Sequence, residues 1–347
     1  MFSKYLDKRK KKFSLNIKNE IAKIPKNTLI ELTNACNHAC IFCYNPIMKR
    51  KTSNLDFNTY EDYINSCYKE GVEEVGLYST GEPFMTKNLD QYIQLAKNKG
   101  IKRLYISTNG SLATLDKVKR CIEAGLDSIK FSINAGTKET YKTIHGYDDF
   151  EKVIKNIKEI YNYKIANKIN LDLMSSFVYT DLTYPEIDLF KKNYNFLFNE
   201  MIFIPSGNQG GRFIKNREKI ISKDKEKVLE NNLLEKIPNK PCEMIWNRLH
   251  LTAEGFMTAC CTDYENDLTF KKFTKNESLF NQFNSKKIRD LRKKHLNNSL
   301  DGTICKSCIY NKDFEYNKIL PNSFKEKNSL SKKKIESHKE RFKKAII

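Results

Sequence analysis

Ten cysteines carry the most specific chemistry in this 347-residue chain, and seven of them fall into two groups. The first group is compact, because Cys36, Cys40 and Cys43 stand in one short loop with the spacing Cys-x3-Cys-x2-Cys. Three thiolates held this closely can bind three irons of a [4Fe–4S] cubane, which leaves the fourth iron open to a substrate or cofactor. The alternative is a zinc knuckle that His38 or a distant cysteine completes.

A second group of cysteines lies in the C-terminal third of the chain. Cys242 and Cys260 stand alone, and Cys305 and Cys308 form a Cys-x2-Cys pair. Four thiolates suffice to ligate every iron of one [4Fe–4S] cluster, and they also suit a structural zinc ribbon. We interpret the remaining three as core thiols, with Cys261 also open as an alternative ligand. These three are Cys67, Cys121 and Cys261.

Short apolar runs alternate with amphipathic stretches along the first two thirds of the chain, which indicates strands and helices in turn. The predicted strands are Leu29–Thr33, Glu74–Ser79, Lys102–Thr108, Ser128–Ile133, Ile169–Val178 and Met201–Ile204. The predicted helices are Asn58–Glu70, Asn88–Asn98, Thr114–Ala124, Phe150–Tyr163 and Tyr184–Phe198. Such alternation indicates βαβ units with a parallel sheet. We therefore expect an α/β fold, a partial (βα)6 TIM-like barrel followed by a small cysteine-rich iron–sulfur domain.

The candidate chemical residues follow the predicted strands, at the ends where such folds place their sites. The first cysteine loop follows the first strand, and Thr80-Gly81-Glu82-Pro83 follows the second. Ser107-Thr108-Asn109-Gly110 ends the third strand, and Ser132-Ile133-Asn134 ends the fourth. Each short motif alone is compatible with an ordinary turn. Their chain order, in phase with the strand ends, indicates one shared site.

In this order the motifs resemble the signature of the radical S-adenosylmethionine (SAM) superfamily, over about residues 29–204. The resemblance implies that the first three cysteines hold a [4Fe–4S] cluster whose open iron chelates the amino and carboxylate groups of SAM. The aromatic Phe42 before the third cysteine fits the usual form of that loop. Electron transfer from the cluster would cleave SAM to a 5′-deoxyadenosyl radical, which abstracts hydrogen from a substrate.

The resemblance also implies contacts to SAM at the strand ends. The second motif resembles the family's Gly-Gly-Glu-Pro, with Thr80 in place of the first glycine, and Glu82 supplies an acceptor for the SAM ammonium. Asn134 stands where relatives often carry an acid, so a negative charge is missing there. The residues expected to contact SAM are Phe42, Thr80, Gly81, Glu82, Pro83, Ser107, Asn109 and Ser132.

The second cysteine group resembles the SPASM/twitch extension of radical SAM enzymes, including its Gly-x4-Cys element at Gly255 and Cys260. Full SPASM domains carry seven cysteines and two auxiliary clusters, whereas here no cysteine follows Cys308. The pattern resembles the shorter version, as in the alcohol-oxidising dehydrogenase of butirosin biosynthesis. This resemblance implies one auxiliary [4Fe–4S] cluster ligated by Cys242, Cys260, Cys305 and Cys308.

Breaks in the pattern divide the chain into five predicted segments. They are a basic N-terminal extension (1–28), the radical SAM core (29–206), a connector (207–240), the SPASM/twitch-like domain (241–310) and a Lys-rich tail (311–347). The connector opens with Gly207–Arg212, which is either a flexible linker or a place where glycine backbone and Arg212 approach a ligand.

Composition restricts the partners and the compartment. The net charge is +20, but the lysines are spread along the chain, which favours solvated helix faces over a nucleic-acid surface. A basic surface would also suit an acidic flavodoxin or ferredoxin, the usual reductants of the family. No apolar run is long enough for a membrane span, and no signal-peptide pattern follows the basic start. We expect a cytoplasmic protein, whose thiols stay reduced and free for metals.

These expectations converge on a radical SAM oxidoreductase-type enzyme. A fully ligated auxiliary cluster suits electron transfer, so the leading prediction is a two-electron oxidation of a small alcohol or sugar-like molecule. Modification of a peptide by a maturase or cyclase is the alternative, although residues 1–28 are too few for an ordinary peptide-recognition domain. Epimerisation, with Cys261 as hydrogen donor, is another. A basic zinc-binding nucleic-acid protein is the alternative of a different class.

Overall fold

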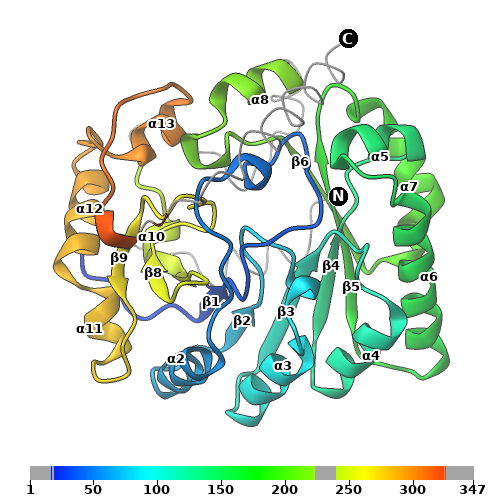
Figure 1. Cartoon of the computed structure of the whole chain (residues 1–347), viewed down its shortest axis with the longest axis horizontal. Coiled ribbons are helices and arrows are strands. Elements are labelled where there is room, and N and C mark those ends of the chain that lie inside the picture. Colours follow the sequence, from blue (N-terminus) through cyan, green and yellow to red (C-terminus); the bar gives the residue numbers. More distant parts are fainter. Residues whose placement is uncertain (1–16, 18, 223–239, 324, 326–347) are drawn as a thin grey trace.

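One curved sheet organises the protein (Figure 1). The computed structural model describes residue 17 and the ranges 19–222, 240–323 and 325. Within these residues the strands follow the order β6-β5-β4-β3-β2-β1-β7-β8-β9. Strands β1 to β6 are parallel, and β7 also lies parallel to β1. Strand β8 runs antiparallel to both of its neighbours, β7 and β9. The expected α/β fold with a parallel sheet is confirmed.

The six strands of the barrel lie close to their predicted positions. They are β1 (Asn27–Ile30), β2 (Glu74–Gly76), β3 (Arg103–Thr108), β4 (Ser128–Ser132), β5 (Asp172–Tyr179) and β6 (Glu200–Pro205). The C-terminal strands are β7 (Leu249–Leu251), β8 (Phe256–Thr258) and β9 (Thr269–Lys272). Strand β5 begins three residues after its predicted start, because the amides of Ile169 and Leu171 make local turn hydrogen bonds, to the carbonyls of Lys164 (2.9 Å) and Ile169 (3.1 Å), instead of ladder bonds.

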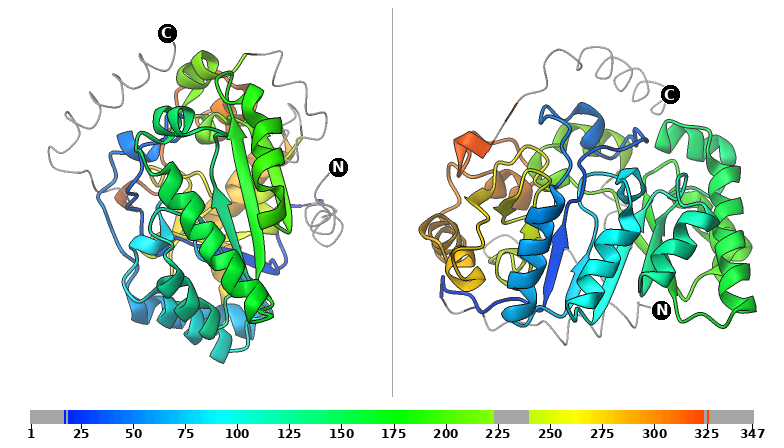
Figure 2. Two further views of the ribbon diagram at one scale, coloured as in Figure 1. Left: turned by 90° about the vertical axis from the view of Figure 1, so that its right-hand side faces the viewer. Right: turned by 60° about the horizontal axis from the view of Figure 1, so that its bottom comes forward.

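Helices cover the outer side of the curved sheet (Figure 1 and Figure 2). The α-helices before residue 222 are α2 (Phe57–Lys69), α3 (Leu89–Asn98), α4 (Leu115–Glu123), α5 (Lys138–His145), α6 (Phe150–Ala166), α7 (Ile187–Tyr194) and α8 (Ile214–Ile220). Those after residue 240 are α10 (Met244–Asn247), α11 (Leu279–Phe283), α12 (Lys286–Leu296) and α13 (Ile304–Tyr310). Short 3-10 turns are η1 (Asn45–Ile47), η2 (Pro83–Met85), η3 (Tyr184–Glu186), η4 (Asn195–Leu197), η5 (Gln209–Gly211) and η6 (Pro321–Ser323).

Two helical regions differ from the sequence-based prediction. The predicted helix over 184–198 is split into η3, α7 and η4, and Pro185 stands in the first of these turns. Helix α5 was not predicted between the fourth strand and α6. Thr137 caps its start by accepting a hydrogen bond from the Thr140 amide, and Gly146 ends it with φ +72°.

Alternation along the strands separates a core face from an inner face. Ile30, Val75, Ile106 and Ile129 are fully buried and belong to the core beneath the helices. Burial of such a side chain contributes about 1.5–3 kcal/mol, so this layer holds strands and helices together. On the inner face of β4 and β5 the register pairs Ser132 with Ser176, and polar side chains line the barrel there.

The C-terminal region continues the barrel sheet instead of forming a separate layer. Strand β7 pairs with β1 in the register Thr28↔Leu249, Leu29↔His250 and Ile30↔Leu251. Three-residue β7 carries no periodicity from which this pairing could be predicted. The predicted segment boundaries at residues 206 and 240 stay predictions, and the first part of the connector forms η5 and α8.

Parts of the predicted segments lie outside the described residues. These are residues 1–16 and 18 of the N-terminal extension, residues 223–239 of the connector, and residues 324 and 326–347 of the Lys-rich tail. Across the described residues, no helix has the length and apolarity needed to cross a membrane.

Candidate functional site

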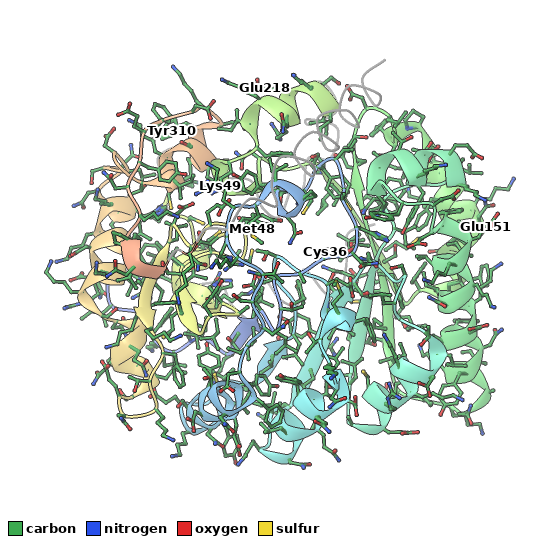
Figure 3. All side chains as sticks on the ribbon, viewed as in Figure 1. Cys36, Met48, Lys49, Glu151, Glu218 and Tyr310 are labelled. Atoms are coloured by element: carbon green, nitrogen blue, oxygen red, sulfur yellow. The ribbon has the colours of Figure 1, made fainter. Side chains whose placement is uncertain are left out.

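The loop of the first cysteine group runs across the mouth of the barrel, where Figure 3 labels Cys36. Helix α5 holds one side of this loop, because the amides of Ala39 and Ile41 donate to the carbonyls of His145 (3.0 Å) and Ile144 (2.9 Å). On the other side the Glu82 amide donates to the Ala35 carbonyl at 2.8 Å. The unpredicted helix α5 therefore positions the cysteines.

The pKa values of the three thiols in this loop are raised by burial, and those of Cys36 and Cys40 also by the charges around them. Burial raises the pKa of Cys36 to about 12, and the nearby Glu82 carboxylate adds to the shift. Burial also raises the pKa of Cys40 far above its usual value, and the charges of Cys43 and Cys36 act in the same direction. The groups that favour the thiolates here are hydrogen-bond donors, not cations. Three thiolates whose charges oppose one another need a compensating positive charge, so the donor set fits the cationic core of a metal cluster.

Two histidines stand beside Cys40. The Nδ1 atoms of His38 and His145 are 3.1 Å apart, and Cys40 Sγ lies 3.5 Å from His145 Nδ1. His145 Nε2 is 2.7 Å from the Ile133 carbonyl, which orients the ring with Nδ1 towards Cys40. The ligand atoms of His38, Cys40 and His145 lie within 4.8 Å of one another and could hold a metal ion. This set leaves out Cys36 and Cys43, and His38 Nε2 is 3.2 Å from Asp149 Oδ2, so it differs from the alternative zinc knuckle, in which His38 would join all three cysteines.

Gly81 lets the loop after β2 approach the first cysteine loop. A Cβ atom at this position would lie 2.3 Å from the Thr33 carbonyl oxygen and 2.6 Å from that of Ala35. No side chain fits at such distances. The glycine of the predicted Thr80-Gly81-Glu82-Pro83 motif therefore has a steric role, which brings the Glu82 backbone against the cysteine loop.

The buried carboxylate of Glu82 already accepts three hydrogen bonds. Its donors are the Phe84 amide (3.0 Å), the Thr108 hydroxyl (2.7 Å) and the Asn109 amide (2.8 Å). Burial raises the pKa of Glu82, and these hydrogen bonds oppose the shift. A carboxylate offers about four lone-pair sites. Glu82 can therefore accept few further hydrogen bonds, and its first role here is to join the ends of β2 and β3. Its contact with the SAM ammonium stays a prediction.

The other predicted SAM-contacting residues lie along the same rim. Asn109 Nδ2 donates to Asn37 Oδ1 at 2.9 Å and lies 4.0 Å from Cys36 Sγ. Ser107 is in β3, and Ser132 Oγ at the end of β4 is 3.0 Å from Ser176 Oγ of β5. Phe42 and Pro83 are buried beside the loops that carry them. The structure thus brings the residues after β1, β2, β3 and β4 together, as predicted.

Asn134, the departure from the family's acid, has a backbone role. Its φ is +60°, a left-handed conformation that asparagine tolerates better than most residues. Its Oδ1 accepts a hydrogen bond from the Val178 amide at 2.7 Å, and its Nδ2 lies 3.2 Å from His145 Nε2. The Asn134 side chain therefore joins the end of β4 to β5 through the Val178 amide and lies beside His145 of α5.

The second cysteine group is assembled from three separate segments. Cys260 follows β8, with its Sγ 3.2 Å from the Thr262 hydroxyl, while Cys305 and Cys308 lie in α13. Cys242 precedes α10, and its amide donates to His295 Nδ1 at 3.4 Å. Their joint ligation of one cluster stays a prediction.

The glycine-rich start of the connector is tightly packed between two of these segments. A Cβ on Gly210 would lie 2.8 Å from Thr262 Oγ1, and one on Gly211 would lie 2.6 Å from the Cys308 amide nitrogen. Both glycines have positive φ. Asn208 Nδ2 also donates to the Cys308 carbonyl at 2.8 Å. Residues 208–211 are packed between the Cys260 loop and α13, so the linker interpretation does not hold for them, whereas nothing lies within 4 Å of a Cβ built on Gly207. The approach of this stretch to a ligand stays a prediction.

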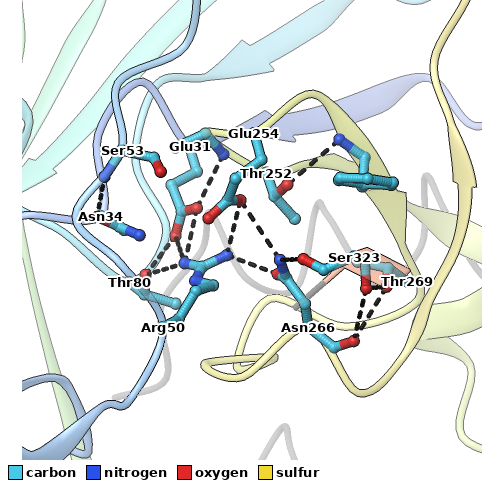
Figure 4. Close-up of polar contacts among 12 residues, drawn as sticks. Glu31, Asn34, Arg50, Ser53, Thr80, Thr252, Glu254, Asn266, Thr269 and Ser323 are labelled. Atoms are coloured by element: carbon cyan, nitrogen blue, oxygen red, sulfur yellow. Dashed lines mark hydrogen bonds and ion pairs between the residues drawn. The ribbon is translucent and has the colours of Figure 1, made fainter. Parts of the chain in front are cut away.

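A buried ionic network, which sequence reasoning missed, joins the two regions (Figure 4). The Arg50 guanidinium donates to both oxygens of Glu31 (2.9 and 2.8 Å), to Glu254 (3.2 Å) and to Asn266 Oδ1 (2.6 Å). It also donates to the Thr80 hydroxyl at 3.2 Å, and that hydroxyl donates to Glu31. Threonine in place of the family's first glycine thus completes this network.

Residues directly after Cys260 and Cys261 also contact the first loop, and they were likewise missed. The Tyr264 hydroxyl lies 3.5 Å from Cys43 Sγ, and Glu265 accepts hydrogen bonds from the amides of Lys49 (2.6 Å) and Arg50 (3.0 Å). The sequence signal was present: Asp-Tyr-Glu-Asn-Asp at 263–267 is a cluster of acids in a Lys-rich chain.

Comparison with known sequences agrees with this geometry. The family model of the radical SAM superfamily matches residues 30–181, and that of the SPASM iron–sulfur cluster-binding domain matches residues 242–309. A probable GTP 3′,8-cyclase of Methanocaldococcus jannaschii is 25% identical over 70% of this chain and 87% of its own length. That of Sulfurisphaera tokodaii is 36% identical over 38% of this chain, but the match spans only 41% of that relative.

Solved structures share the fold. SuiB of Streptococcus suis bound to the precursor peptide SuiA has a TM-score of 0.60 at 14% identity, with 82% of this chain and 69% of that chain covered. The protein anSMEcpe with bound AdoMet (SAM) has a TM-score of 0.58 at 16% identity, with 93% of this chain and 98% of that chain covered. BtrN in complex with AdoMet and 2-DOIA has a TM-score of 0.51 at 17% identity, with 79% and 88% covered. At these identities the likeness extends to the fold alone.

The two domain matches account for both cysteine groups. A radical SAM domain works with a [4Fe–4S] cluster and SAM, and a SPASM domain binds auxiliary iron–sulfur clusters, so these expected cofactors are confirmed. The zinc-binding nucleic-acid protein is excluded by the same matches. With residues 30–181 as its radical SAM domain and residues 242–309 as its SPASM domain, this chain belongs to the radical SAM superfamily.

Proposed function

We propose that this radical SAM enzyme catalyses the two-electron oxidation of a small alcohol or sugar-like molecule. When bound, the first cluster and SAM supply a 5′-deoxyadenosyl radical, which abstracts a hydrogen atom from the substrate. The observation that carries the proposal is the set of four cysteines in the SPASM domain: Cys242, Cys260, Cys305 and Cys308. Four thiolates would ligate every iron of one cluster and leave no iron for a substrate, which suits an electron acceptor.

The atoms and electrons of this oxidation balance. The substrate carbon loses a hydrogen atom to the adenosyl group, its hydroxyl loses a proton, and one electron remains to be removed. That electron goes to the auxiliary cluster. Cleavage of SAM uses one electron from a flavodoxin- or ferredoxin-type reductant, which our proposal includes as partner. The products are methionine, 5′-deoxyadenosine and a carbonyl compound.

The chain's own residues bind and shield the reactants in this proposal. Cys36, Cys40 and Cys43 hold the first cluster, and α5 and the Gly81 loop fix their positions from both sides. The Ser132 and Ser176 hydroxyls, 3.0 Å apart on neighbouring strands, offer donors to a hydroxyl-bearing ligand at the inner face. The packed loop 208–211 and the buried Arg50 network close the region between the domains, which protects a radical from unwanted hydrogen donors.

Cyclisation of a nucleotide is the second candidate. The M. jannaschii relative, named a probable GTP 3′,8-cyclase, matches over 87% of its length, whereas the S. tokodaii relative matches over 41%. A substrate that binds directly to an auxiliary iron would need one of the four SPASM cysteines to be free. The number of cysteines that ligate the auxiliary cluster therefore separates the two candidates.

The mass of the product decides between these reactions. The reconstituted enzyme would be incubated anaerobically with SAM, a reductant, and either GTP or a panel of deuterated sugars and aminocyclitols. Oxidation predicts a product lighter by two hydrogens, with substrate deuterium in 5′-deoxyadenosine. A product of unchanged mass formed from GTP would overturn the oxidation in favour of cyclisation. Solvent deuterium at an inverted carbon would instead indicate epimerisation, with Cys261 as the first hydrogen donor to test.

A further inference from the structure

The SPASM domain contacts the first cysteine loop through three consecutive residues. Tyr264 places its hydroxyl 3.5 Å from Cys43 Sγ. Glu265 accepts the two backbone hydrogen bonds from the chain that follows this loop, and Asn266 Oδ1 accepts from the Arg50 guanidinium. These residues begin only three positions after Cys261, in the turn that also carries Cys260.

The turn that presents Tyr264 is held from both ends. The Asp263 carboxylate accepts hydrogen bonds from the Thr258 hydroxyl (2.6 Å) and from the amides of Asp267 (2.7 Å) and Leu268 (3.0 Å). Asp267 forms ion pairs with Arg212 and with Lys318 (3.0 Å). Tyr264 itself is buried, and its ring lies against the Tyr44 ring, with centroids 5.6 Å apart. The position of the hydroxyl is therefore set by the SPASM domain.

The hydroxyl of Tyr264 has two neighbours and one proton. It lies 2.8 Å from the side-chain oxygen of Gln209, in the loop next to α13, as well as 3.5 Å from Cys43 Sγ. A thiol at Cys43 can donate its proton to the tyrosine oxygen, but a thiolate that ligates iron can only accept. The oxygen and nitrogen of a glutamine amide exchange places by rotation. With its amide turned, Gln209 donates to Tyr264, and Tyr264 donates to the sulfur.

We propose that Tyr264 is a positioning residue of the first cluster, which donates a hydrogen bond to the Cys43 thiolate and raises the cluster's reduction potential. The proposal rests on the ligand role of Cys43 in the proposed function. A reduced cluster carries one more negative charge, so a donor at a ligand sulfur stabilises the reduced form more than the oxidised form. Because the SPASM domain supplies this donor, the reduction potential of the first cluster depends on the correct folding of that domain.

The test is an EPR-monitored redox titration of the first cluster in the reconstituted holoenzyme. Tyr264→Phe removes only the hydroxyl, and we expect a more negative midpoint potential at unchanged iron content. A tenfold fall in the ratio of reduced to oxidised cluster at fixed potential corresponds to about 59 mV for a one-electron couple. A second readout is the g-values of the reduced cluster, which a loss of general stability would not move.

Tyr141→Phe is the matched control. Tyr141 is also a buried tyrosine near the first cysteine loop, stacked on His145 with ring centroids 4.0 Å apart. Among the described residues its hydroxyl has no hydrogen-bond partner, so its removal should leave the potential unchanged. Equal potentials for Tyr264→Phe and the parent would overturn the inference. A cluster that persists in Cys43→Ala would instead refute the ligand assignment of the proposed function.

Discussion

The two cysteine groups are positioned in different ways. Cys36, Cys40 and Cys43 stand within eight consecutive residues after one strand, so the local chain already keeps the three thiols close. The SPASM cysteines come from the start of α10, the end of β8 and helix α13, and η5 lies between the last two. A compact loop needs the surrounding barrel mainly for orientation, whereas the second group depends on the complete tertiary structure. The contacts of Tyr264 and Arg50 show that the first site is nevertheless tied to the second region.

The largest expected difference between the groups is in SAM cleavage. Cys40→Ala should lower the rate of 5′-deoxyadenosine formation by at least about 100-fold, because the SAM-binding cluster is lost. Cys305→Ala should keep this rate within a few-fold but abolish substrate oxidation. Iron content should fall from about eight to about four per chain in each variant, since each removes one four-iron cluster. Cleavage at the parent rate in Cys40→Ala would refute the assignment of the first site.

Two glycine substitutions test the steric part of the comparison. Gly211→Ala should lower iron in the SPASM site alone, since its Cβ would lie 2.6 Å from the Cys308 nitrogen and φ is +90°. Gly81→Ala should lower iron in the first site, because its Cβ would lie 2.3 Å from the Thr33 carbonyl. Gly207→Ala is the control, as nothing lies within 4 Å of its added Cβ. EPR of the separately reduced clusters measures both sites, and full occupancy of the SPASM site in Gly211→Ala would contradict the steric role.

The Arg50 network tests whether the two regions unfold as one unit. Arg50→Met leaves the buried Glu31 without its partner, and loss of one member of such a pair costs about 3–5 kcal/mol. We expect this loss in the free energy of unfolding of the metal-free chain, measured by urea denaturation with a single transition. Arg120→Met, which breaks the exposed pair with Asp116, should cost at most about 0.5 kcal/mol. Two separate transitions in the parent would show that the network does not couple the regions.

His250 gives a smaller and pH-dependent test at the strand that joins the regions. Burial, with a contribution from the Arg248 charge, lowers the pKa of His250 to about 3. The unfolded chain binds a proton below about pH 6.5 and the native chain does not, so this stabilisation is present above that pH and is lost as the pH falls towards 3. Between pH 7.5 and pH 5 the loss is about 2 kcal/mol.

His250→Gln should therefore weaken the acid dependence of the unfolding free energy by about that amount. The comparison is made between variant and parent, because His145 and His295 are also buried with lowered pKa values and contribute equally to both. Identical acid dependence in the two proteins would show that the pKa of His250 is the same in the native and unfolded states, and would contradict the prediction.

The local sequence determined the elements and the first site. Period-two and helical patterns indicated the barrel strands within a few residues, and the motifs after β1 to β4 predicted which residues gather at the rim. These features depend on contacts between near neighbours in the chain and on the rule that parallel strands place their C-terminal ends at one edge. Even the departures, Thr80 and Asn134, were visible in the sequence, although their roles were not.

The tertiary structure alone decided how the two regions join. The three residues of β7 are too few to show a period, and their pairing with β1 depends on the distant edge that the barrel leaves open. Helix α5, the tight packing of Gly210 and Gly211, and the contact of Tyr264 with Cys43 likewise depend on long-range contacts. Arg50 and Glu31 read as ordinary charges in the sequence, because burial, which makes their pairing obligatory, is a property of the whole fold.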